Sequence, residues 1–180
     1  NLKVTHYNNG DEIQNITNNN EWSSLSIGAY GDYNNNPSNS ETYGRLYNGY
    51  TVIDERGICP EGWHVPSYDE LQILVDYLGG DPPAGGKMKA TGTIEGGDGL
   101  WYHPNEGATN ESGYTGFPSG WRHCTNGAYY EMGTETYFWS STSIGNTDLF
   151  FRHLQKDSSQ IDRTPIGYPA GHSIRCIQDQ

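Results

Sequence analysis

Positive charge is scarce in this sequence. Its 180 residues include 10 Lys and Arg against 22 Asp and Glu, for a formal net charge of -12 at pH 7. A protein that follows the phosphate backbone of a nucleic acid needs a basic stripe, and an anionic lipid surface attracts clustered Lys and Arg. We therefore expect no nucleic-acid partner and no attraction to an anionic membrane surface.

Long hydrophobic runs are also absent. Only 33% of the residues are hydrophobic, and no run reaches the roughly 18 apolar residues of a membrane-spanning helix, so we expect no direct membrane insertion. No signal peptide opens the chain, which is therefore expected to be a mature or trimmed soluble domain. The aromatic content of 13% separates the chain from disordered acidic segments, which are poor in aromatics.

Helix-forming sequence is limited to one convincing segment, residues 67–78. Ser67 is a suitable N-cap with Glu70 three residues later, which makes a capping box, and Gly79-Gly80 supplies the stop. Its apolar residues fall on one helical face: Leu71, Leu74, Val75 and Leu78. One helix cannot supply the repeated crossovers of a large parallel α/β fold. Together with 24 Gly and 9 Pro, this excludes helical bundles as well.

The rest of the chain predicts short strands and much loop. A helical turn is expected at 21–25 behind an Asn20 cap, and the glycine-rich stretch 79–120 is expected to be irregular. Alternation of bulky and polar residues predicts strands at 43–50, 137–141, 149–155, 159–163 and 173–177. We expect a single α+β domain over residues 1–180, in which short antiparallel strands accompany one clear helix at about 68–78.

The three cysteines lack metal-site spacing. No CxxC pair is present, so zinc and thioredoxin-type sites are disfavoured. The candidate disulfide joins Cys59 to Cys176 and leaves Cys124 single; three buried, reduced thiols are the alternative. Such a bridge would close a loop of roughly 117 residues and stabilise the fold by at most ~4–5 kcal/mol. The loop-rich, Lys-poor composition favours an extracellular setting.

Catalytic and metal-binding motifs are missing. The six His residues are scattered without HxH or HExxH spacing, and no Gly-x-Ser-x-Gly elbow occurs. His64 is expected to be a hydrogen-bonded structural imidazole. Cys124 beside His123 resembles a thiol–base pair only superficially, because neighbours in a strand point apart. We expect no catalytic residue, no metal ligand and no cofactor.

The segment Leu149–Gln155 indicates a recognition surface. In a strand, Phe150, Arg152 and Leu154 share one face, while Phe151, His153 and Gln155 share the other. A buried Arg152 would need acceptors, which loop carbonyls could supply. The opposite face would then present a phenyl, an imidazole and an amide to solvent, a combination typical of binding surfaces. The alternative is that Phe151 belongs to the core and the register is shifted by one.

Four motifs in this order resemble the Fibrobacter succinogenes major paralogous (FISUMP) domain of secreted bacterial proteins. They are Tyr43–Tyr47 (YGRLY), Ile58–Ser67 (ICPEGWHVPS), Phe138–Thr142 (FWSST) and Ser173–Ile177 (SIRCI), with weaker matches at Gly79–Asp81 and Ala84–Lys89. The resemblance covers about residues 1–178. The start at Asn1 resembles the middle of the family's domain, so a preceding N-terminal strand is expected to be missing.

The FISUMP family is similar to the C-type lectin fold, which formylglycine-generating enzymes share. The resemblance implies this fold and supports the Cys59–Cys176 pair, since both cysteines stand within matching motifs. The Glu-Pro-Asn and Trp-Asn-Asp triplets of calcium-dependent lectins are absent, so calcium-mediated sugar binding does not carry over. The cysteine arrangement of formylglycine-generating enzymes is absent too, so their oxidase activity does not carry over.

Domains of this fold also serve as variable receptors of diversity-generating retroelements, in which adenine-directed mutagenesis rewrites chosen codons near the C-terminus. Residues 143–170 show a medley of the side chains that altered Asn codons encode, although Gln155, Lys156 and Gln160 cannot arise from AAC. The resemblance thus implies a variable ligand-binding region at 143–170. Its expected ligand-binding residues are Ile144, Asn146, Thr147, Asp148, Phe151, His153, Gln155, Asp157, Asp162, Thr164 and Ile166.

The leading hypothesis is an extracellular binding module, an adhesin or receptor-binding domain on a bacterial surface lipoprotein, pilus tip or phage particle. Its partner would be a protein or glycan on another cell or host surface. One alternative is a structural surface domain in which residues 144–170 are an ordinary polar loop region. A less favoured alternative is a formylglycine-generating-like enzyme that uses Cys124 or Cys176.

Overall fold

The computed structural model describes residues 1–179 as a mixed α+β fold in which strands predominate. The helices are α1 (Asn19–Ser23), the 3-10 helix η1 (Tyr33–Asn35), α2 (Pro37–Tyr43), α3 (Gly49–Val52), α4 (Tyr68–Tyr77) and α5 (Ala84–Met88). The strands are β1 (Gln14–Asn15), β2 (Ala29–Gly31), β3 (Leu46–Asn48), β4 (Trp63–His64), β5 (Ser119–Arg122), β6 (Tyr129–Met132), β7 (Glu135–Ile144), β8 (Asp148–Gln155), β9 (Asp162–Gly167), β10 (Gly171–His172) and β11 (Ile177–Gln178).

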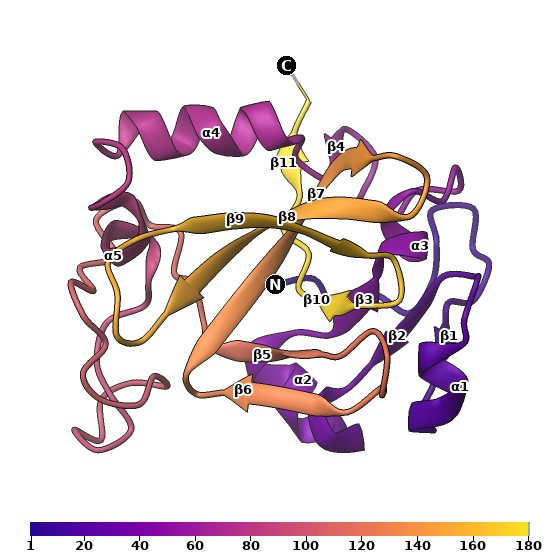
Figure 1. Cartoon of the computed structure of the whole chain (residues 1–180), viewed down its shortest axis with the longest axis horizontal. Coiled ribbons are helices and arrows are strands. Elements are labelled where there is room, and N and C mark those ends of the chain that lie inside the picture. Colours follow the sequence, from indigo (N-terminus) through magenta and orange to yellow (C-terminus); the bar gives the residue numbers. More distant parts are fainter. Residues whose placement is uncertain (180) are drawn as a thin grey trace.

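One large sheet organises the molecule. Its strand order is β1-β2-β3-β10-β5-β7-β8-β9, with β6 paired to β5, and a small second sheet joins β4 to β11. Most pairs are antiparallel, as expected, but β1–β2 and β5–β7 are parallel. Helix α4 lies along one side of the β7–β8–β9 end, and the shorter strands lie on the other (Figure 1). Strand β9 is the last strand at this end of the sheet, so one of its backbone edges is unpaired.

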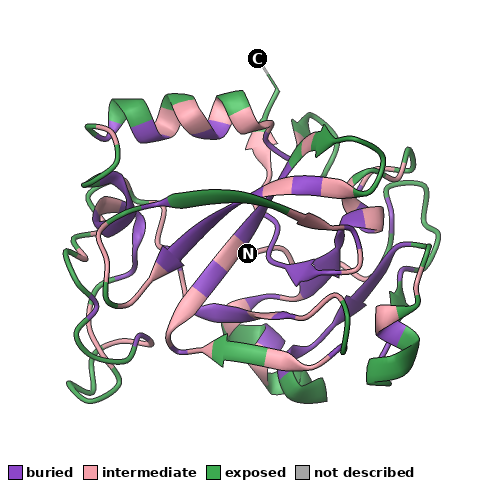
Figure 2. Cartoon of the chain, viewed as in Figure 1, coloured by how far each residue is buried: buried purple, intermediate pink, exposed green. Residues whose placement is uncertain are grey.

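Helix α4 confirms the predicted helix and its cap. The Ser67 hydroxyl accepts a hydrogen bond from the Glu70 amide at 3.2 Å, and the Glu70 carboxylate accepts one from the Ser67 amide at 2.8 Å. These two bonds satisfy amides that the first turn of a helix leaves without partners. Leu71 and Val75 are buried against the sheet, whereas the outer side of the helix is exposed (Figure 2).

Three other predicted elements need correction. The strand expected at 43–50 is only β3, because Tyr43 ends α2 and the Asn48 side chain caps α3 by accepting from the Thr51 amide. The helical turn expected behind Asn20 is capped by Asn18 instead. The strand expected at 159–163 was placed too early, since β9 begins at Asp162.

Two further segments differ from the expected boundaries. The stretch 79–120 is irregular as expected for most of its length, but it contains the short helix α5 and the start of β5. The segment expected as a strand at 173–177 is split. Only Ile177 of this range belongs to a strand, β11, while β10 ends at His172.

The sheet has a hydrophobic core on each side. One core contains Trp139, Leu149 and Phe151, and the other contains Phe138 and Leu154 beneath α4. Strand β8 therefore contributes to both cores, because it lies between β7 and β9 and both of its faces are covered. Figure 2 shows this contrast between the largely buried β8 and the exposed β9.

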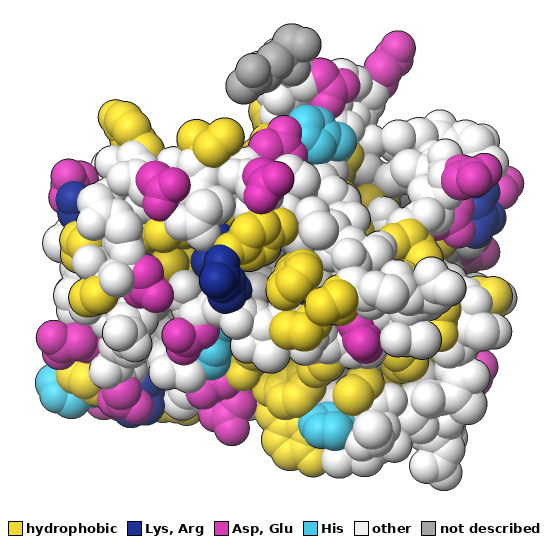
Figure 3. Space-filling view, turned by 45° about the horizontal axis from the view of Figure 1, so that its top comes forward, with side chains coloured by type: hydrophobic (Ala, Val, Ile, Leu, Met, Phe, Trp, Pro, Cys, Tyr) yellow, Lys and Arg dark blue, Asp and Glu magenta, His cyan; other side chains and the backbone are white. Residues whose placement is uncertain are grey.

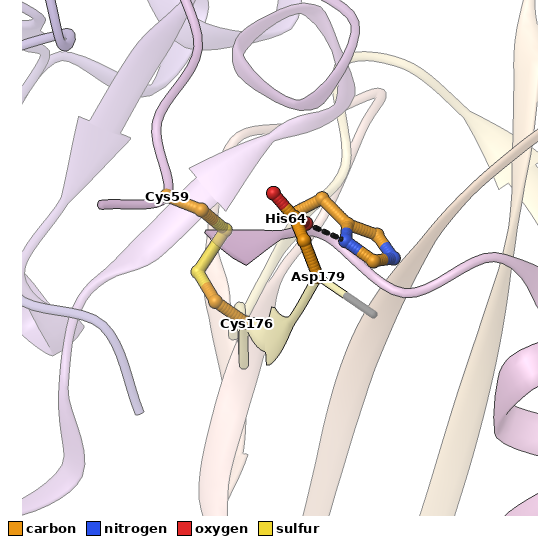
Figure 4. Close-up of a disulfide and its surroundings, with 4 residues drawn as sticks. All are labelled: Cys59, His64, Cys176 and Asp179. Atoms are coloured by element: carbon orange, nitrogen blue, oxygen red, sulfur yellow. Dashed lines mark hydrogen bonds and ion pairs between the residues drawn. A yellow bond between two sulfur atoms is a disulfide. The ribbon is translucent and has the colours of Figure 1, made fainter. Parts of the chain in front are cut away.

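The disulfide Cys59–Cys176 is present, and Cys124 is a free thiol, as predicted. The bridge spans 117 residues and joins the segment before β4 to the segment before β11, next to the small sheet that these strands form (Figure 4). Beside it, His64 contacts the Asp179 carboxylate at 2.6 Å and the Glu70 carboxylate at 3.0 Å. These two partners raise the pKa of His64, and the imidazole is hydrogen-bonded as expected.

Candidate ligand-binding surface

The pairing of β8 with β9 determines which predicted site residues lie together. Phe151 pairs with Thr164, and His153 pairs with Asp162. Directly paired residues share one face of an antiparallel sheet. We call this side of β8 and β9 the aromatic face, and the opposite side, which α4 covers, the helix face.

The expectation that Phe151 and His153 face solvent is wrong. Each is only 8% exposed, although both lie on the face that was predicted. The Phe151 ring packs against Tyr137 at 5.4 Å and against the buried His172 at 4.9 Å between ring centroids. The physical reason is that Tyr137 of β7 and His172 of β10 place their rings against this face, while α4 covers the other (Figure 1), so the strand is covered on both sides.

His153 is held in a polar contact network beneath the surface. Its Nε2 lies 3.2 Å from the Glu135 carboxylate, and its ring stacks on Tyr137 at 4.2 Å. The Tyr137 hydroxyl donates to the same carboxylate. Burial alone would raise the pKa of Glu135, but the contacts with His153 and Tyr137 outweigh it and lower this pKa. Gln155, which is half-buried, lies 3.3 Å from the other nitrogen of His153.

The exposed predicted residues form one patch and one outlier. Thr147 lies in the β7–β8 turn, where its carbonyl accepts from the Tyr168 amide just beyond β9. This contact brings the turn next to the C-terminal half of β9. We define the edge patch as the predicted residues at the β7–β8 turn, with the strand residues that flank it, and on β9: Ile144, Asn146, Thr147, Asp148, Asp162, Thr164 and Ile166. By their pairing, Ile144 and Asp148 lie on the helix face, whereas Asp162, Thr164 and Ile166 lie on the aromatic face. Most are exposed; Asp148 and Ile166 are half-buried.

Asp157 lies outside the edge patch. It follows β8, whereas the β7–β8 turn precedes this eight-residue strand, so roughly 25 Å of extended chain separate the two ends. Asp157 is exposed, but its carboxylate pairs with the neighbouring Lys156 at 2.7 Å. The eleven predicted residues are therefore not one contiguous site.

An aromatic group beside the edge patch was not predicted. Trp121 lies 5.0 Å from His123, 6.0 Å from Tyr130 and 5.4 Å from Tyr137, measured between ring centroids. All four rings are exposed or half-buried. Tyr137 links this group to Phe151, whose partner Thr164 belongs to the edge patch. Hydrophobic and His side chains also gather in the lower centre of Figure 3.

A sequence signal for this aromatic group did exist. Asn126-Gly127 is a strong hairpin turn signal, and bulky residues alternate before it at Trp121 and His123. The structure has the corresponding hairpin, β5 and β6, at this place.

The thiols do not have the surroundings of a nucleophile. Cys176 is consumed in the disulfide, and burial raises the pKa of Cys124, whereas a reactive thiol needs a lowered one. The His123 Nδ1 contacts the amide and hydroxyl of Thr125. Within residues 1–179, no group of three His, Cys, Asp or Glu side chains is placed to hold a metal ion.

None of the helices in residues 1–179 has both the length and the apolar character needed to cross a bilayer.

Comparison with known proteins identifies a family and nothing closer. No curated protein and no solved structure matches the chain. The model of the Fibrobacter succinogenes major domain matches residues 1–178, which is nearly the whole sequence. The chain therefore belongs to the Fibrobacter succinogenes major domain family.

Proposed function

We propose that this domain is an extracellular binding module with a C-type-lectin-like scaffold that presents the edge patch to a ligand. The ligand would be a protein or a glycan on another cell or on a host surface. The domain would act as an adhesin or receptor-binding domain on a bacterial lipoprotein, a pilus tip or a phage particle. Affinity comes from direct side-chain contacts, without metal or covalent chemistry.

The observation that carries this proposal is the contrast between β9 and its neighbouring strand β8. Asp162, Thr164 and Asn146 are exposed, and the side chains of Thr164 and Asn146 have no hydrogen-bond partner among residues 1–179. On the neighbouring strand β8, Phe151 and Leu149 are packed into a closed core. Side chains in such a patch can change with little effect on stability, since exposed substitutions usually cost within about 0.5 kcal/mol.

The neighbouring aromatic group supports a binding role. Trp121, Tyr130 and Tyr137 leave part of their rings exposed, and Tyr and Trp are enriched at protein interfaces because they combine a large apolar area with a polar tip. In this proposal they anchor the ligand, and the edge patch selects it. Phe151 and His153 hold the adjacent strand in place and do not contact the ligand.

The unpaired edge of β9 fits recognition by side chains rather than by strand addition. Pro165 lies within β9 and lacks the N–H that a further strand would need. A proline on an edge strand discourages uncontrolled pairing with other chains. In this proposal residues 143–170 are a diversified region of the kind that retroelements rewrite, with the changes concentrated at the exposed positions.

The test is a binding screen with matched variants. The native domain and the triple variant Asn146→Ala, Thr147→Ala, Thr164→Ala are screened against bacterial cells, host cells and glycan arrays. The control removes three exposed side chains from helix α2, at Ser38, Glu41 and Thr42. We expect equal melting temperatures for all three proteins and loss of binding only in the edge-patch variant.

The structural-spacer alternative predicts a different outcome. If the native domain binds nothing in the screen, or if the control loses binding as much as the edge-patch variant, the edge patch is not a binding site and the spacer role is favoured. Sibling genes offer a second check, since the proposal expects their differences to cluster at exposed positions of 143–170.

A further inference from the structure

The helix face of β8 and β9 contains a pair of arginines directly opposite each other. Arg152 pairs with Arg163 across the two strands, and both guanidinium groups lie over the Tyr68 ring of α4, at 5.1 and 5.3 Å from its centroid. Like charges directly opposite in a sheet destabilise the pairing. In a chain with a net charge of -12, this concentration of positive charge calls for a physical reason.

These two arginines differ from the other four in their partners. Arg45 and Arg56 pair with carboxylates, while Arg122 and Arg175 donate several bonds each, chiefly to backbone carbonyls. Arg152 donates one bond, from Nη2 to the Gln72 side chain at 2.6 Å. Among residues 1–179, neither Arg152 nor Arg163 has a carboxylate within 4 Å.

Arg152 is also buried with an unused donor. The residue is 4% exposed, and its Nε–H has no hydrogen-bond partner among the described residues. A buried polar group without a partner costs free energy comparable to a lost hydrogen bond, and more when the group is charged. Burial lowers the pKa of this guanidinium from its ordinary value. The guanidinium nevertheless keeps its charge at neutral pH, as arginine does in proteins.

Both arginines line a cavity of about 350 Å³ between α4 and β9. A cavity of this volume falls within the range of small-ligand sites. Val75 and Ile161 provide apolar wall, and the polar lining besides the arginines comes from Gln72, Asp81 and Asp162. A Lys or Arg patch is visible near the centre of Figure 3, with acidic and hydrophobic side chains around it.

The residues that line the cavity favour one chemical class of anion over others. Two guanidinium groups match a planar carboxylate through paired N–H donors. One oxygen of the Asp81 carboxylate accepts from the Ile161 amide at 3.0 Å. This carboxylate would repel a doubly charged phosphate, but its other oxygen can accept from a hydroxyl group. A ligand with a carboxylate and a nearby hydroxyl satisfies both kinds of group.

We propose that this cavity binds the carboxylate of an acidic sugar, a uronic or sialic acid unit of a glycan. The carboxylate lies between the guanidinium groups of Arg152 and Arg163, and a sugar hydroxyl donates to Asp81. This site lies on the helix face, whereas the aromatic group of the proposed function lies on the other side of the sheet. The proposed function and this site can therefore be tested separately: either can prove wrong while the other is confirmed.

The direct test is an NMR titration of the domain with sodium D-glucuronate. The Arg152 Nε–H supplies a reporter signal from a side chain that lines the cavity. We expect glucuronate to shift this signal with a dissociation constant on the order of millimolar, as small polar ligands bind. The neutral matched sugar D-glucose should leave the signal unchanged.

Variants connect the signal to the arginine pair. Arg163→Gln removes an exposed guanidinium, so the fold is retained, and it should weaken glucuronate binding at least tenfold. The control variant Lys3→Gln also removes one positive charge, but from an exposed side chain that does not line the cavity. It should change the affinity for glucuronate less than twofold. Equal weakening by both variants would mean that only the overall charge matters, which overturns the site.

Titrations with other anions test which chemical groups of the ligand the site recognises. Acetate that binds as tightly as glucuronate would remove the assignment of a sugar hydroxyl to Asp81. If sulfate or phosphate binds more tightly than glucuronate, the site is a general anion site and not one for a carboxylate, which contradicts the proposal. If none of these compounds shifts the Arg152 signal, the cavity is filled by water alone and the proposal is wrong.

Discussion

The two faces of strand β8 are both buried, but in different ways. On the aromatic face, Phe151 and His153 pack among rings, His153 contacts the Glu135 carboxylate at 3.2 Å, and the ring nitrogens of the buried His172 have no hydrogen-bond partner among residues 1–179. On the helix face, Arg152 carries charge into a cavity and leaves a donor unused. One face is closed by its own side chains, whereas the other leaves room for a ligand. Burial alone therefore does not distinguish the two faces, and neither do unpartnered polar atoms, which occur on both; the cavity beside Arg152 does.

The largest expected effect comes from a substitution on the aromatic face. Phe151→Ala removes a ring that is packed against Tyr137 and His172, and we expect it to lower the free energy of unfolding by about 3–5 kcal/mol. Its cross-strand partner Thr164 is exposed, so Thr164→Ala should change that free energy by no more than about 0.5 kcal/mol. Urea denaturation of both variants measures the difference. Similar losses in both would show that β9 is not a replaceable surface.

A smaller effect is expected from the opposite face. Gln72→Ala removes the one hydrogen-bond acceptor of the buried Arg152, which should cost about 1.5–3 kcal/mol because the partner is charged. Ile73→Ala on the same helix alters an exposed side chain and serves as the control, with a change of about 0.5 kcal/mol or less. Chemical denaturation measures both. An unchanged midpoint for Gln72→Ala would mean that water already satisfies Arg152.

The buried His172 on the aromatic face predicts that the free energy of unfolding depends on pH. Burial, with the neighbouring His153, lowers the pKa of His172 well below its usual range. The unfolded chain therefore binds a proton at this residue that the folded chain does not, so stability falls as the pH falls below about 6.5. The slope from this residue is at most about 1.4 kcal/mol per pH unit.

The variant His172→Phe isolates this contribution. Its free energy of unfolding between pH 6.5 and 5 should depend less steeply on pH than that of the native protein, since the titrating group is gone while the ring remains. Equal slopes in the two proteins would contradict a neutral, buried His172.

The smallest expected effect comes from a substitution at the N-terminus of α4, and it tests which part of the fold this helix stabilises. Ser67→Ala removes the cap of this helix, at a cost of about 1 kcal/mol. Because α4 covers only the helix face, the loss should loosen the cavity around Arg152 and leave the aromatic face intact. Amide hydrogen exchange should then increase in α4 more than in β7. Equal increases in both elements would mean that the two cores unfold as one unit.

Local signals in the sequence predicted local features well. The Ser67 cap, the apolar stripe and the glycine stop predicted α4 to within a residue or two, because neighbouring residues alone determine them. The matching motifs around Cys59 and Cys176 led to the disulfide. The alternation along 149–155 also correctly predicted that Phe151 and His153 share one face.

The exposure of that face could not be predicted from alternation. Which side of a strand is covered depends on elements far away in the sequence, here His172 of β10 on one side and Gln72 of α4 on the other. One signal was available: Leu149, Phe150, Phe151 and Leu154 supply apolar residues to both faces, which is typical of a strand buried on both sides. The cavity around Arg152 had no sequence signal, because its parts come from segments about 80 residues apart.

The central claim is that the edge patch is a replaceable surface on a fixed scaffold. Saturation mutagenesis of the displayed domain, sorted for resistance to protease, tests it at Asn146, Thr147 and Thr164 against Phe151 and His153. The account predicts that most substitutions at the first three positions leave the domain folded, while most at Phe151 and His153 do not. Equal tolerance at the two sets of positions would contradict it.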